Sequence, residues 1–140
     1  MNQNKELGIS IKEVFLVKSE VEFLSVTAEK TYHLALTSFS RAVEDNGKQL
    51  VVNVGFNLMS GVEKPMFNFL ATYVAVYAKA EGCETAWDEF SDGNALSHIV
   101  PYLREYVSNV TMRMPIRPLY MRPLNCYALI DTFMVQQSHG

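Results

Sequence analysis

The stretch of sequence that decides the fold is residues 97–125, SHIVPYLREYVSNVTMRMPIRPLYMRPLN. Its first half has apolar residues at three- and four-residue steps, which predicts a helix from about Ser97 to Arg113 with one apolar stripe. Ser97 can cap this helix, and Pro101 then falls in the first turn, where its missing N–H has no intrahelical partner. We expect the stripe to serve as core and oligomer interface, with Leu103 buried at its centre. Its members are Leu96, Ile99, Leu103, Val107 and Val110.

The second half of the stretch is a crossover interrupted by proline. Pro115, Pro118 and Pro123 forbid both a helix and a central strand. The segment is nevertheless too apolar for a free loop, so we expect it to lie extended against another part of the chain. Asn125 then caps a short final helix over residues 126 to about 137.

Upstream, four segments have the alternation of β-strands, and they cover residues 9–23, 31–43, 50–59 and 66–78. Strands followed by helices predict the α+β class, with one long helix covering one face of a small sheet. We expect a disordered N-terminus at residues 1–10 and a single domain at residues 11–137.

The same alternation marks turns and irregularities. Asn46 and Gly47 tolerate positive φ and predict a hairpin turn between the second and third strands. The first strand loses its alternation part-way, which is typical of a β-bulge. In the second strand, simple alternation puts Phe39 and Arg41 on the face opposite Leu36. The fourth strand is apolar on both faces, and self-association is the simplest way to bury the face that the helix leaves open.

The composition excludes several classes of function. The chain has 140 residues, of which 49% are hydrophobic and 19% charged, and its net charge of −3 provides no basic face for nucleic acid. It has no apolar run long enough to span a membrane and no apolar signal segment near its polar start, so we expect a cytoplasmic protein without membrane insertion. Cys83 and Cys126 are far apart in the sequence and are expected to be reduced thiols.

The sequence also lacks the patterns that catalysis requires. His33, His98 and His139 are not paired by spacing, and no nucleophile, phosphate-binding or zinc-binding motif occurs. We therefore predict no catalytic residues, no metal and no cofactor. The loop at residues 81–92 carries five acids around two aromatic residues, which favours a solvated loop tacked down by those aromatics. The alternative is a loop that docks a partner.

Methionines concentrate in the second half of the chain, and two interpretations are open. They either fill the core, or they line a surface that accepts many partners, for which flexible and polarisable side chains are suited. An extended apolar crossover beside a short helix favours a groove. The residues that we predict to line it are Leu119, Tyr120, Met121, Leu124, Phe133 and Met134.

These features resemble the SecB chaperone family. The similarity rests on Pro101-Tyr102-x-Arg104-Glu105, on the proline crossover ending in Pro123-Leu124-Asn125, and on the final helix with its Gln136-Gln137 pair. The resemblance implies a four-stranded antiparallel sheet, a long helix, a crossover and a second helix, assembled as a homotetramer that is a dimer of dimers. It also implies binding of unfolded polypeptide clients in hydrophobic grooves without ATP.

Two departures bear on the kind of client. Export members of this family dock on the SecA motor through acids in the turn that matches residues 60–65, where this chain has only Glu63 beside Lys64. They also use a polar tail beyond the last helix, and this chain stops at Gly140. Other SecB relatives protect the antitoxin of a toxin–antitoxin system, and we expect that role here.

Three alternatives stay open at this point. Glu20 and Glu22 supply part of an acidic patch, which with Glu63 keeps weak SecA docking and a role in export as an alternative. A second alternative is a domain that binds a small hydrophobic ligand, with Arg117 and Arg122 as its charged groups. A third is a purely structural subunit of a larger complex.

Overall fold

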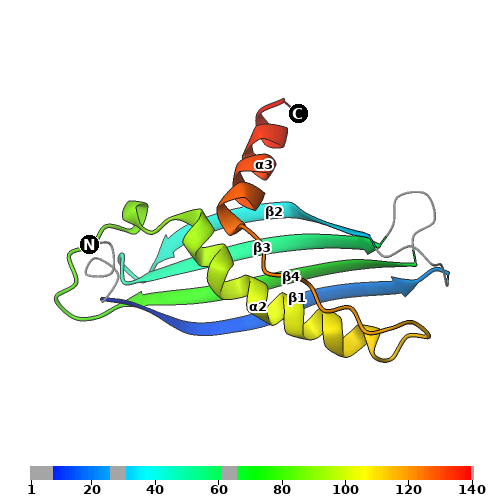
Figure 1. The fold of residues 1–140 in the computed structure, drawn as a ribbon. Coiled ribbons are helices and arrows are strands. Elements are labelled where there is room, and N and C mark those ends of the chain that lie inside the picture. Colours follow the sequence, from blue (N-terminus) through cyan, green and yellow to red (C-terminus); the bar gives the residue numbers. More distant parts are fainter. Residues whose placement is uncertain (1–7, 26–30, 61–65, 140) are drawn as a thin grey trace.

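The computed structural model describes residues 8–25, 31–60 and 66–139, and it has the α+β architecture implied by the resemblance (Figure 1). Four antiparallel strands form one sheet in the order β1-β4-β3-β2, so β1 and β2 are its edges. The strands are β1 (Ile9–Phe23), β2 (Tyr32–Glu44), β3 (Gln49–Ser60) and β4 (Phe67–Lys79). A 3₁₀ turn η1 (Trp87–Glu89), the long helix α2 (Asp92–Thr111) and the final helix α3 (Cys126–His139) follow.

The hairpin between β2 and β3 has the turn that the sequence predicts. Asp45, Asn46 and Gly47 all have positive φ, of 54°, 54° and 86°. Glycine and asparagine adopt this left-handed conformation at low cost, which is why this segment reverses the chain. The indole Nε1 of Trp87 donates a hydrogen bond of 2.8 Å to the Gly47 carbonyl and fixes the later loop to the hairpin.

Both edge strands contain bulges that reset which side chains face the core. The register of β1 against β4 shifts between Ile11 and Glu13 and again between Leu16 and Lys18, which confirms the predicted irregularity. In β2 a shift between Leu36 and Ser38 was not predicted. Because one extra residue reverses the facing of everything after it, Phe39 and Arg41 lie on the same side as Leu36, and the sequence-based assignment of these two was wrong.

The corrected position of Arg41 explains how the loop before α2 is held. Its Nη1 donates to the carbonyl of Phe90 at 2.6 Å and to Oδ1 of Asp92 at 2.8 Å, and its Nη2 donates to the carbonyl of Trp87 at 2.5 Å. The side chains of Trp87 and Phe90 are both buried, so these two aromatic residues anchor the loop to the core as predicted. One arginine on β2 therefore fixes the place where α2 begins.

The long helix begins earlier than the sequence pattern suggests. Its N-cap is Ser91, whose hydroxyl accepts from the Asn94 N–H at 3.1 Å, whereas Ser97 lies inside the helix and donates to the Asn94 carbonyl. Pro101 is therefore in the helix interior rather than in the first turn. It lies on the exposed face, where the carbonyl that loses its partner can be hydrated while the opposite face stays packed. The first turn, Asp92-Gly93-Asn94, is polar or small and gives no apolar periodicity to detect.

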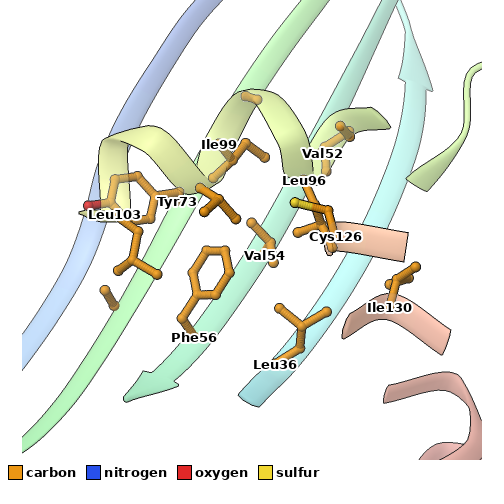
Figure 2. Close-up of a cluster of buried hydrophobic side chains, with 14 of the residues drawn as sticks. Leu36, Val52, Val54, Phe56, Tyr73, Leu96, Ile99, Leu103, Cys126 and Ile130 are labelled. Atoms are coloured by element: carbon orange, nitrogen blue, oxygen red, sulfur yellow. The ribbon is translucent and has the colours of Figure 1, made fainter. Parts of the chain in front are cut away.

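The apolar stripe of α2 packs onto β3 and β4 of its own chain (Figure 2). Leu96, Ile99, Leu103 and Val107 are fully buried, and Val110 is half-buried. In the close-up, Leu96, Ile99 and Leu103 lie beside alternate residues of the two central strands, among them Val54, Phe56 and Tyr73. Four of the five side chains are thus occupied as core, Val110 keeps part of its surface exposed, and the use of the stripe as an oligomer interface stays a prediction.

Replacing Leu103 with alanine tests this packing. Leu103 is 1% exposed, so its loss leaves a cavity under α2, and the free energy of unfolding should fall by about 2–5 kcal/mol. Urea unfolding followed by circular dichroism measures the change. Val135→Ala is the control, because Val135 is 56% exposed and its truncation should cost less than about 0.5 kcal/mol. Equal stability of Leu103→Ala and the parent would contradict the helix register.

Candidate functional site

The crossover between α2 and α3 is fixed along its length by three hydrogen bonds. The N–H of Leu119 donates to Oγ1 of Thr111 at 2.8 Å, and Nε of Arg104 donates to the carbonyl of Met121 at 3.2 Å. The N–H of Arg122 donates to the hydroxyl of Tyr32 on β2 at 3.0 Å. The segment therefore lies extended against α2 and the β2 edge, as its prolines and apolar residues predict.

An open apolar groove lies where the crossover, α3 and the β2 edge meet, with a volume of about 320 Å³. We call it the α3 groove. Its floor on the sheet side is Tyr32 and Leu34 of β2, and the opposite wall comes from the end of the crossover and one face of α3. The residues of that wall are Arg122, Pro123, Leu124, Asn125, Ala128, Leu129 and Thr132.

The six predicted groove residues occupy four different environments. Leu124 lines the α3 groove, and Leu119 is half-buried next to the core. Tyr120 and Met134 are exposed, at 70% and 43%. Met121 and Phe133 are buried in the core, at 2% and 8%, so neither presents its side chain to a ligand in this conformation.

The sequence-based list missed Leu129, Tyr32 and Leu34. Leu129 could have been found, because it lies one helical turn beyond Asn125, the residue that caps α3. The two β2 residues gave no signal, since the sequence does not show which strand will form the edge beside α3.

Further apolar side chains lie exposed on the same part of the molecule. Besides Tyr120 and Met134, Tyr127 is 55% exposed and Val135 is 56% exposed on α3, which extends away from the sheet in Figure 1. Single exposed apolar residues are ordinary, but several on one short helix beside a groove are characteristic of an interaction surface.

A second region of exposed apolar surface lies at the opposite edge of the sheet. Phe15, Leu16 and Val17 of β1 are 43%, 37% and 49% exposed. An open pocket of about 240 Å³ lies between this part of the strand and α2, and Tyr102 and Tyr106 line it on the helix side. An edge strand with large apolar side chains and unpaired backbone groups is prone to pair with another chain unless it is covered.

The carboxylates predicted for motor docking lie on the face of the sheet away from the helices. Glu20 and Glu22 are exposed on β1 beside Asn68 of β4. Nζ of Lys18 approaches Oε1 of Glu20 at 3.7 Å and offsets part of the negative charge. The third predicted member, Glu63, lies outside the described residues, as does most of the turn at 60–65.

The ionisable groups of the described residues do not converge on a catalytic arrangement. His98 contacts Tyr77 through its Nδ1 at 3.1 Å and stacks on Phe90, whereas His33 lies exposed on β2. Burial raises the pKa of the Tyr77 phenol and of the Cys126 thiol, so both groups stay neutral at physiological pH.

Burial, and then the neighbouring Tyr106 and Glu105, likewise raise the pKa of Tyr73. In the described part of the chain no three His, Cys, Asp or Glu residues are placed to hold a metal ion. No described helix is long and apolar enough to cross a membrane.

The fold was compared with solved structures. The Rv1957 SecB-like chaperone of Mycobacterium tuberculosis, solved with a ChAD peptide from the HigA1 antitoxin, superposes with a TM-score of 0.71 over 87% of this chain and 95% of that one. This chain has the SecB-like fold. The two sequences are only 18% identical, so the SecB-like fold is what the similarity establishes.

The remaining comparisons add little to the SecB-like fold. A Streptococcus agalactiae protein of unknown function matches over 82% of this chain and 97% of its own, with 12% identity and a TM-score of 0.49, too low to support an inference. No family model and no curated protein matches the sequence.

Proposed function

We propose that this protein is an ATP-independent holdase chaperone that binds unfolded or aggregation-prone polypeptides in the α3 groove. The observation that carries the proposal is the open apolar groove between β2 and α3, and α3 exposes further apolar residues outside its lining. An extended apolar segment of a client buries surface there, at roughly 25 cal/mol per Å² before ordering costs. Such binding is broad in specificity and persists in salt.

A dedicated client, such as the antitoxin of a toxin–antitoxin system, is the form of this function that we favour. Its support is the similar fold of the M. tuberculosis SecB-like chaperone, which was solved with an antitoxin peptide. An antitoxin with an exposed apolar segment offers the extended surface that the α3 groove accepts.

We further propose that the protein is a homotetramer. Phe15, Leu16 and Val17 expose apolar surface on an edge strand, and such an edge tends to pair non-specifically with other chains. Pairing with a second copy of the same chain would cover it. Light scattering at micromolar concentration should give a mass of about 64 kDa, four times the 15.9 kDa of one chain. A stable monomer would contradict the assembly. A dimer would mean that two copies pair through their β1 edges but that no tetramer forms.

Client capture by the α3 groove is tested by suppression of aggregation. The parent should keep a chemically denatured protein soluble as it is diluted from denaturant, and the protection should persist at high salt. Leu129→Asn should weaken protection, because it places an amide in the apolar wall and lowers the apolar area available to a client.

The matched control is Val43→Thr, a polar replacement at an exposed position of β2 that does not line the groove. Circular dichroism checks that both variants are folded. Met121 is unsuitable for this test because it is buried in the core, so that its replacement would change stability. Protection that disappears in high salt, or that is equal in the two variants, would contradict binding by apolar burial in this groove.

The alternative function, delivery of preproteins to SecA, is kept open by Glu20 and Glu22 lying together on the outer face of β1. A single exposed ion pair contributes only about 0–1 kcal/mol, and Lys18 already offsets part of this patch. Calorimetry against SecA should therefore show weak or no binding. A Kd of about 1 μM or tighter that is lost in Glu20→Lys/Glu22→Lys would favour export over antitoxin protection.

A further inference from the structure

The crossover that forms one side of the α3 groove carries only positive charge. Residues 106–130 include Arg113, Arg117 and Arg122 and contain no Asp or Glu, although the whole chain has a net charge of −3. The acids are concentrated elsewhere, notably in the loop at residues 81–92. The crossover is thus positive although the protein as a whole is negative, and the nearest acid along the chain is Asp131, exposed on α3 between Leu129 and Thr132.

Of these arginines, Arg122 lines the groove and is its charged residue, whereas Arg113 and Arg117 lie outside the lining. The backbone N–H of Arg122 is fixed to the Tyr32 hydroxyl, so its side chain starts from a defined point at the β2 edge. Ion pairs within the described residues are those of Lys18 with Glu20 and of Arg41 with Asp92. Arg122 therefore has no acidic partner in the described part of the chain.

The neutral polar groups of the groove also have hydrogen-bond donors to offer. The side-chain oxygen of Asn125 is occupied by the Ala128 N–H at 3.1 Å, which leaves the amide NH₂ group. The Tyr32 oxygen accepts from Arg122, which leaves its O–H hydrogen free to donate. Together with the guanidinium group, these donors are complementary to a carboxylate.

We propose that the client segment held in this groove is an extended apolar stretch interrupted by an aspartate or glutamate side chain. Its apolar side chains pack against Leu34, Leu124 and Leu129, and its carboxylate pairs with Arg122. This inference rests on the proposed chaperone function and names the chemistry of the client. Apolar burial supplies most of the affinity, and the carboxylate selects among apolar segments.

A preference for acidic over basic peptides would distinguish local pairing with Arg122 from long-range attraction by the net charge of the protein. A protein with a net charge of −3 repels an acidic peptide and attracts a basic one at a distance. A preference for the acidic peptide therefore has to arise from local groups. Exposed pairs are worth only a few-fold in affinity, so the expected effects are modest but measurable.

The experiment measures the binding of short fluorescein-labelled peptides of Leu, Val, Tyr and Ser to the full-length protein by fluorescence anisotropy. The peptides are identical except for Glu, Gln or Lys at one central position, and all have amidated C-termini. The Glu peptide should bind about threefold more tightly than the Gln peptide and about tenfold more tightly than the Lys peptide. Arg122→Glu should reverse this order, and Arg122→Gln should abolish it.

Arg117→Glu makes the same charge change in the same crossover, outside the groove, and should leave the order unchanged. Circular dichroism and light scattering confirm that the variants are folded and assembled. A further arm uses the Gln peptide with a free C-terminal carboxylate. If that peptide binds as tightly as the Glu peptide, the groove recognises chain ends, and the proposal of an internal acidic side chain is overturned.

The remaining outcomes separate this inference from the proposed function. Equal binding of the Glu, Gln and Lys peptides, all weakened by Leu129→Asn, overturns the acidic preference and leaves the chaperone function standing. A preference for Lys overturns it as well. Failure of every peptide to bind, together with no suppression of aggregation, overturns both.

Discussion

The prolines of the crossover are the constraint on which the position of α3 and the α3 groove depends. Pro115, Pro118 and Pro123 prevent the segment from continuing α2 or from joining the sheet, so it has to return extended across the side of α2. An extended segment needs partners for its backbone groups, and Thr111, Arg104 and Tyr32 supply them. Since the last of these contacts is with β2, the crossover delivers α3 beside that edge and leaves the groove between them.

The position of α3 depends equally on where α2 begins. Arg41 fixes the loop before α2 through two carbonyls and the Asp92 carboxylate, and the helix starts there. The first turn contains Gly93, where an added Cβ would lie 2.4 Å from a ring carbon of Tyr127 on α3. A glycine at that position lets α3 approach α2 closely, so the two ends of the crossover are both fixed and its path is determined.

The sequence predicts the parts of this structure that depend on local patterns and fails where a distant contact decides. The alternation around Val54 and the three- and four-residue steps around Leu103 each come from a single element, and the structure confirms both. Near Thr37 the apolar positions of β2 change parity, from Leu36 to Phe39, but only the register against β3 shows that this change is a bulge, which turned Arg41 to the other face. Within the crossover, neither spacing nor composition shows that Met121 points into the core while Tyr120 points to solvent. The Met121 carbonyl is also bonded by Arg104 of α2, a contact with another element that the sequence does not show.

The sheet order has a consequence for how self-association and client binding can coexist. The exposed apolar residues of β1 and the α3 groove lie at opposite edges, with β4 and β3 between them. Neighbouring strands are about 4.8 Å apart, so the two edges are separated by about 14 Å of hydrogen-bonded sheet. Two copies that pair through β1 therefore keep their grooves on the outer sides of the pair. In the proposed assembly, pairing through β1 would cover one apolar surface and leave the other open to polypeptides, so each pair of copies would present two grooves to one client.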